Sequence, residues 1–158
     1  MVALRMVIGI SAAALAILAL AGAGLYWWRG SAAPRIDADD AAQVAQGQSV
    51  YVAQCALCHG SNLEGQPNWR ERLANDRLPA PPHDASGHTW HHPDSALFGI
   101  TKHGLAPYAP PGYESDMPAF DEKLSDDQIA AVLAYIKSTW PPDIRARQAR
   151  INAQAEEQ

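Results

Sequence analysis

The sequence predicts an all-α domain with about three main helices and long loops, preceded by one N-terminal transmembrane helix. First, segments near residues 41–54, 93–104 and 125–140 carry helix start and stop signals or apolar residues at helical spacing. Second, the stretches between them are rich in proline and glycine and show no sustained period. Third, residues 6–28 form an uncharged apolar run. A chain of 158 residues has room for one ordinary domain plus accessory segments.

The N-terminal apolar run is long enough to cross a bilayer. Its 23 residues without a charge span the membrane with some tilt. A cleaved signal peptide is the alternative, because small residues at 19–23 offer cleavage sites. The aromatic cluster at 26–28 favours an uncleaved anchor, since such residues gather at the membrane interface. We therefore expect an anchor or signal segment over residues 1–29 and a linker over residues 30–38.

The folded domain is expected over residues 39–142, and its first two helices have recognisable ends. Acidic residues directly before residue 41 suit the N-terminus of a helix over 41–54. A second helix starts at Pro93, since proline is favoured at the first helical position, and stops at Gly104. The sequence therefore places one helix before and one after a long irregular stretch.

The last predicted helix has the clearest signals. Ser125 and Gln128 form a capping box, and Pro141 ends the helix. Its apolar face consists of Ile129, Val132, Leu133 and Ile136. The polar C-terminal tail, residues 143–158, is expected to be a frayed helix or disordered.

The charge of the chain is acidic beyond its N-terminal segment. The whole chain has a net charge of -5, and three of its 12 basic residues, Arg5, Arg29 and Arg35, precede residue 36. Residues 36–158 therefore hold nine basic and all 17 acidic side chains, a net charge of -8. Because nucleic acid is a polyanion, we expect no nucleic-acid partner.

The only two cysteines, Cys55 and Cys58, are separated by two residues, and His59 follows directly. This C-x-x-C-H pattern is typical of c-type haem attachment, in which both thiols form thioether bonds and the histidine ligates the iron. Half a zinc site would need a second ligand pair, and a thioredoxin-like dithiol would need a βαβ setting. The sequence therefore predicts one covalent haem c. A large buried cofactor would also explain the long loops at 60–86 and 105–120.

A second axial ligand is expected from Met117. The chain has three methionines, and the other two, Met1 and Met6, lie in the N-terminal segment. Met117 lies in an irregular loop before the last helix, where it can reach a cofactor. A methionine that only fills a packing gap is the alternative, and a bis-histidine haem is another. The neighbouring haem motif favours Met117 as the ligand.

With these motifs, the chain resembles the single-haem class I cytochrome c family over residues 40–140. In that family a glycine and an aromatic residue stand eight and four positions before the first cysteine, matched here by Gly47 and Tyr51. Tyr135 matches the aromatic residue of the terminal helix. A glycine inside a helix costs up to about 1 kcal/mol against alanine. The resemblance implies the class I cytochrome c fold, in which this glycine lets the terminal helix approach closely.

The resemblance also implies roles for residues around the haem. A proline after the motif often accepts a hydrogen bond from the ligand histidine, and Pro67 is the nearest candidate, with a plain turn as the alternative. Trp69, Arg70 and Trp90 are candidates for hydrogen bonds to the haem propionates, although such residues also serve in packing and on surfaces.

A histidine-rich stretch departs from the compact family pattern. Four histidines crowd into ten residues, namely His83, His88, His91 and His92. Such tracts can bind copper or zinc. The alternative, which we favour, is a polar loop over the haem edge.

The resemblance implies a one-electron carrier with His/Met-ligated haem and no catalytic residues. The sequence shows neither a nucleophile with a neighbouring base nor a phosphate-binding loop. Nothing in it therefore indicates an enzyme or a small-molecule substrate. The alternatives are a cytochrome subunit of a membrane dehydrogenase or terminal oxidase, and a peroxidase or ligand sensor in which the methionine dissociates. Because c-type haem is attached outside the cytoplasmic membrane, we expect a periplasmic domain on a single-pass bacterial inner-membrane anchor, or a soluble periplasmic protein after cleavage. The expected partners are respiratory redox proteins that dock at the haem edge.

Overall fold

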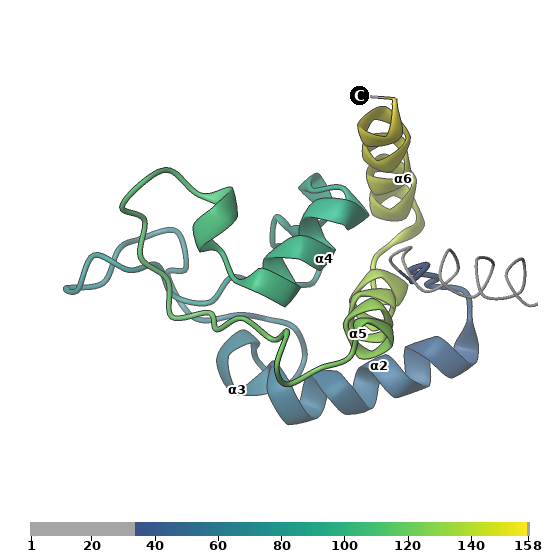
Figure 1. The fold of residues 1–158 in the computed structure, drawn as a ribbon, viewed down its shortest axis with the longest axis horizontal. Coiled ribbons are helices and arrows are strands. Elements are labelled where there is room, and N and C mark those ends of the chain that lie inside the picture. Colours follow the sequence, from purple (N-terminus) through teal and green to yellow (C-terminus); the bar gives the residue numbers. More distant parts are fainter. Residues whose placement is uncertain (1–33, 158) are drawn as a thin grey trace, which may run out of the picture. The chain divides into compact units, whose positions relative to one another are not determined.

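The computed structural model describes residues 34–157, and this part of the chain consists of helices, turns and loops (Figure 1). The α-helices are α2 (Ala41–Gln54), α3 (Ala56–His59), α4 (Asp94–His103), α5 (Asp126–Ser138) and α6 (Pro142–Glu156). Two short 3-10 helices, η1 (Thr89–His91) and η2 (Ala106–Tyr108), lie in the loops. The predicted all-α fold is therefore confirmed for the described residues.

The predicted membrane segment over residues 6–28 lies outside the described residues. Between residues 34 and 157, no helix has both the length and the apolar character that a membrane crossing requires.

Helices α2 and α5 pack against each other and make the most extensive contact between two elements of the described chain (Figure 1). Helix α2 begins where Asp40 accepts hydrogen bonds from the backbone N–H groups of Ala42 and Gln43, at 2.9 and 3.2 Å. At Gly47 the two helices come so close that a Cβ atom would lie 1.9 Å from the carbonyl oxygen of Ala131 on α5. The close approach expected for this glycine is therefore confirmed.

Helix α5 supplies the largest part of the core. Its predicted capping box is present, because the side chains of Ser125 and Gln128 each accept a hydrogen bond from the other residue's backbone N–H. The predicted apolar face, Ile129, Val132, Leu133 and Ile136, is buried. Trp140 follows the helix, is 3% exposed, and donates a hydrogen bond of 2.8 Å to the carbonyl oxygen of His83. This bond attaches the histidine-rich loop to the end of α5.

Helix α4 stops before Gly104 as its sequence predicts, but it begins at Asp94, because Pro93 is the N-cap and not the first helical residue. Gly104 at the C-cap has a φ of +77°, a conformation that favours glycine. The backbone N–H of Phe120 then donates to the carbonyl oxygens of Thr101 and Lys102 at 3.2 and 3.1 Å. These bonds hold the end of the long 105–120 loop against α4.

The polar C-terminal tail differs from the expectation of fraying or disorder, because it forms the 15-residue helix α6. Gln148 on this helix is 2% exposed and donates a hydrogen bond of 2.7 Å to the carboxylate of Asp94. Lys137 of α5 also donates to Asp94, at 2.6 Å. Since this contact is made by polar side chains, a search for an apolar helix face does not reveal it.

Candidate functional site

The cysteine motif lies where α2 ends and α3 begins. The backbone N–H of Cys55 still bonds the carbonyl oxygen of Tyr51, at 2.9 Å, and His59 N–H bonds the carbonyl oxygen of Cys55, at 3.0 Å. Cys55 is half-buried, whereas Cys58 is exposed, and both thiols are free. Burial, with the nearby Cys58 second, raises the pKa of the Cys55 thiol to about 11. Neither cysteine is in a disulfide, and backbone hydrogen bonds hold both of them on one helical turn.

His59 is buried in a setting that keeps its ring neutral. Its side chain is 7% exposed, and burial lowers its pKa, opposed in part by the hydrogen bond to Pro81. Its Nδ1 lies 2.8 Å from the carbonyl oxygen of Pro81, which can only accept, so the ring proton is on Nδ1. The unprotonated Nε2 remains for a metal ion, and this is the form in which histidine ligates metals.

The prediction that Pro67 supplies this carbonyl is wrong. The chain between residues 66 and 80 forms an excursion that closes on itself, because Gln66 N–H donates to the carbonyl oxygen of Ala80 at 2.9 Å. The returning loop segment therefore brings Pro81, 22 residues beyond His59, to the ring that the nearer proline was expected to meet.

Tyr51 supports the helical turn that bears the cysteine motif and His59. Its side chain is fully buried, and its hydroxyl donates to the carbonyl oxygen of Gly60, at 2.9 Å. Its ring also packs against Tyr135 of α5, with centroids 5.5 Å apart. Burial is the largest of the effects that raise the pKa of Tyr51, so the hydroxyl stays protonated and can donate.

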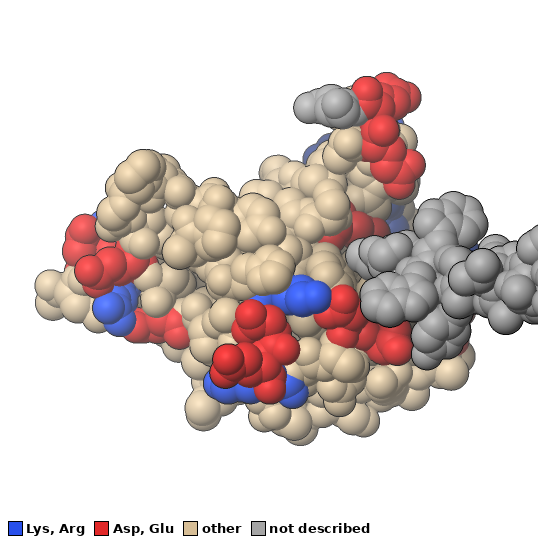
Figure 2. Space-filling model, in the orientation of Figure 1, with Lys and Arg blue, Asp and Glu red and all other residues tan. Residues whose placement is uncertain are grey.

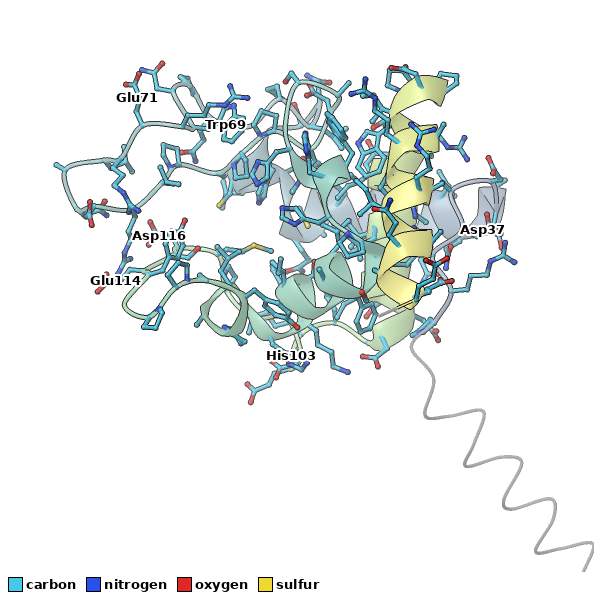
Figure 3. The ribbon with its side chains drawn as sticks, turned by 90° about the horizontal axis from the view of Figure 1, so that it is seen from above. Asp37, Trp69, Glu71, His103, Glu114 and Asp116 are labelled. Carbon is cyan, nitrogen blue, oxygen red and sulfur yellow. The ribbon has the colours of Figure 1, made fainter. Side chains whose placement is uncertain are left out.

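Met117 lies in the loop that runs toward α5. Its side chain is half-buried, and it packs against the same hydrophobic core cluster as Cys55. Its backbone N–H donates to the hydroxyl of Ser115, at 3.1 Å. Glu114 and Asp116, labelled in Figure 3, both accept hydrogen bonds from the guanidinium of Arg77, that of Glu114 at 2.8 Å. These ion pairs join the Met117 loop to the 66–80 excursion.

The three residues expected near the propionates lie in side-chain stacks. Trp69 stacks on His88 with centroids 5.2 Å apart, and the guanidinium carbon of Arg70 lies 4.0 Å from the Trp69 ring centroid. The indole of Trp90 donates to the carbonyl oxygen of Ala85, at 3.4 Å. Their propionate contacts stay predictions.

The four clustered histidines have two different environments. His83 points to the motif and stacks on His59, with ring centroids 4.0 Å apart and planes at 24°. His88 and His92 contact each other edge to face at 5.5 Å, and His91 packs on Trp90. Within residues 34–157, no group of three or more His, Cys, Asp or Glu side chains is placed to hold a metal ion. The structure therefore gives no support to a copper site in this tract.

The contact between His83 and His59 is the part of the site that sequence reasoning missed. Spacing alone groups the four histidines together. His83, the one that contacts His59, differs from the others in the sequence only by its place two residues after Pro81. Identifying Pro81 as the partner of His59 would have pointed to His83. In an extended segment, side chains two residues apart face the same way, so a residue two positions after Pro81 also faces His59.

The donor set fits a covalent haem c. Two free thiols, separated by two residues, precede a neutral imidazole whose Nε2 is available, and a thioether packs against the same core.

Comparison with known proteins agrees with this chemistry. The Cytochrome c family model matches residues 44–140. The chain is 31% identical over 99 residues to the Cbb3-type cytochrome c oxidase subunit CcoP of Azospirillum sp. (strain B510), covering 63% of this chain and 29% of that protein. The match to CcoP of Azospirillum brasilense is also 31% identical, over 97 residues, covering 61% of this chain and 28% of that protein. The chain therefore spans less than a third of the length of these relatives.

A shorter relative aligns over most of its length. Cytochrome c6 of Leptolyngbya boryana is 33% identical over 95 residues, which cover 60% of this chain and 91% of that protein. No solved structure gives a significant match. The matched region contains the cysteine motif, the methionine loop and helix α5. The chain therefore belongs to the cytochrome c family and carries covalently bound haem c.

Proposed function

We propose that Cys55 and Cys58 form the two thioether bonds to haem c, and that His59 and Met117 are the axial ligands of its iron. When bound, the haem supplies one-electron chemistry between the ferric and ferrous states. The observation that carries this assignment is the 2.8 Å hydrogen bond from His59 Nδ1 to Pro81, because it leaves Nε2 as the ligating atom. Trp69, Arg70 and Trp90 remain candidates for the propionates.

The protein's own residues favour a carrier and not an enzyme. With His59 and Met117 both bound, no axial position is left for oxygen or peroxide. Thioether ligation raises the reduction potential, and the buried surroundings of His59 keep water away from this side of the iron. Since the turn that bears His59 is held by backbone hydrogen bonds, it has little need to rearrange when one electron is gained or lost.

The partners follow from charge and location. We infer that the domain is periplasmic, held at the inner membrane by residues 6–28 or released after cleavage of that segment. Acidic side chains gather in several groups on the face shown in Figure 2, and residues 36–158 carry a net charge of -8. A redox protein with a basic docking surface would complement this charge, and weak docking would allow rapid release.

A second candidate is a cytochrome subunit of an oxidase or dehydrogenase complex. The likeness to CcoP favours it, although the match covers 29% of that protein. The likeness to cytochrome c6, which covers 91% of that protein, favours a separate carrier. Purification from solubilised membranes with haem staining distinguishes them, because a subunit would co-migrate with a larger complex and a carrier would not.

The ligand assignment is tested by expression with a c-type haem maturation system. The wild-type protein should stain for haem on a denaturing gel, and the double variant Cys55→Ala/Cys58→Ala should not. His103→Ala, at an exposed histidine, is the matched control for His59→Ala, which should lose the low-spin spectrum. Haem staining that survives in the cysteine variant would refute the covalent attachment.

A further inference from the structure

One short segment contacts the proximal imidazole twice. Pro81 accepts the hydrogen bond from His59 Nδ1 at 2.8 Å. Two residues later, the ring of His83 lies flat against the ring of His59, with centroids 4.0 Å apart and planes at 24°. The first contact holds an edge of the imidazole, and the second covers one of its faces.

His83 is itself fixed on every side. Its backbone N–H donates to the carbonyl oxygen of Leu63, at 2.8 Å, and its own carbonyl oxygen accepts from the Trp140 indole, at 2.8 Å. Its ring Nδ1 lies 2.8 Å from the hydroxyl oxygen of Thr89, a buried residue of η1. The edge of the Tyr51 ring completes the enclosure, with centroids 6.4 Å apart. The stacked ring is therefore a fixed wall and not a mobile loop side chain.

A hydrogen bond and a wall constrain different motions. The bond to Pro81 fixes where Nδ1 points, but a bent hydrogen bond still permits the ring to turn about its Cβ–Cγ bond. A flat neighbour 4.0 Å away blocks that turn, because the rotating ring would enter the space of the His83 ring.

We propose that His83, anchored by Thr89, is a positioning residue that fixes the plane of the His59 imidazole relative to the haem. This inference rests on the proposed role of His59 as an axial ligand. The plane of an axial imidazole decides which iron d orbitals it perturbs, and that choice sets the magnetic anisotropy of the ferric low-spin state. Residues that orient a metal ligand act in this way without touching the metal.

The test uses the ferric full-length haem protein and four variants. His83→Leu removes the flat ring, His83→Phe keeps a flat ring without its ring nitrogens, and Thr89→Val removes only the anchoring hydroxyl. His103→Leu, the same change at an exposed histidine, is the control. The readouts are the haem-methyl proton resonances and the anisotropy of the electron paramagnetic resonance g values. Neither follows from stability alone.

We expect His83→Leu to shift the haem-methyl resonances well beyond any shift in His103→Leu, while its optical spectrum keeps both axial ligands. His83→Phe should restore the wild-type pattern for the most part, and Thr89→Val should give an intermediate shift. A His83→Leu pattern that matches the control overturns the proposal. If His83→Leu yields no haem protein, Thr89→Val decides, and a pattern equal to the control then overturns it. An absent His/Met low-spin spectrum in the wild type would instead refute the proposed function.

Discussion

The two sides of the proposed haem site are built in different ways. On the His59 side, the ligand is buried, lies in a helical turn, and is held by backbone hydrogen bonds and packed rings. On the Met117 side, the ligand lies in an irregular loop whose link to the opposite loop is a set of exposed ion pairs from Arg77. Packing in the core therefore fixes the position of His59, whereas ion pairs at the surface hold the Met117 loop.

This difference predicts where the site is easily disturbed. Single changes in buried, well-packed contacts are costly, because the neighbouring atoms cannot rearrange cheaply. Exposed ion pairs contribute little and are screened by salt. Substitutions on the His59 side should therefore act on folding, haem retention and the orientation of the imidazole, whereas those on the Met117 side should act on ligand exchange and potential.

The largest expected effect comes from the scaffold of the His59 side. Gly47→Ala would place a Cβ atom 1.9 Å from the carbonyl oxygen of Ala131, so α2 and α5 would have to separate. We expect a loss of about 3 kcal/mol in the free energy of unfolding, since overpacking and backbone shifts cost amounts of this order. Chemical denaturation of the haem protein measures it. Gln48→Ala, at the exposed neighbouring position, should change stability by less than about 0.5 kcal/mol.

The next largest effect is expected from a substitution that removes only the proposed Met117 ligand. Met117→Ala should leave haem covalently attached and lower the reduction potential by on the order of 100 mV, because axial ligands set potentials over a range of about 0.8 V. The weak near-infrared band of sulfur-to-iron coordination should disappear. Potentiometry and near-infrared absorption check both expectations. Survival of the band would show that another residue ligates the iron.

A smaller loss of stability is expected when the hydrogen bond from Tyr51 to the turn after the cysteine motif is removed. Tyr51→Phe removes the hydroxyl that donates to the Gly60 carbonyl at 2.9 Å and leaves that acceptor without this partner. Because the Gly60 carbonyl still accepts from the backbone N–H of Leu63, at 3.3 Å, we expect a loss of about 1 kcal/mol, the usual net contribution of one hydrogen bond. Tyr108→Phe, at a residue 48% exposed, is the control and should cost much less. Equal losses in the two variants, measured by denaturation, would contradict a supporting role for Tyr51.

The sequence predicted best those features that neighbouring residues encode. The Asp40 cap, the Ser125 and Gln128 capping box, and Pro93 with Gly104 place the ends of three helices within a residue or two of those observed. These capping signals are local, so one sequence carries them. The close helix crossing at Gly47 was instead predicted through the resemblance to the cytochrome c family, in which this glycine lets the terminal helix approach closely.

Features that depend on distant contacts were missed. Pro81 replaces Pro67 because a hydrogen bond between Gln66 and Ala80 closes the excursion, and nothing in either segment alone predicts that pairing. The packing of α6 depends on Gln148 and its bond to Asp94, and polar contacts leave no hydrophobic period to detect. In both cases the information lies in how remote segments meet.

The smallest effect is expected from removing the exposed ion pairs that Arg77 makes with the Met117 loop. Arg77→Ala removes the ion pairs with Glu114 and Asp116, which join the Met117 loop to the 66–80 excursion. Because the loop would open more often, an added ligand such as imidazole should displace Met117 a few-fold faster at low ionic strength. The difference from wild type should shrink at high salt, where the pairs are screened. Asp76→Asn is the matched control, since the exposed Asp76 side chain pairs with Arg72 within the excursion. Stopped-flow displacement of the ferric protein measures the rates. An equal acceleration in both variants would mean that general loosening of the excursion, and not the link between the loops, controls access to the iron.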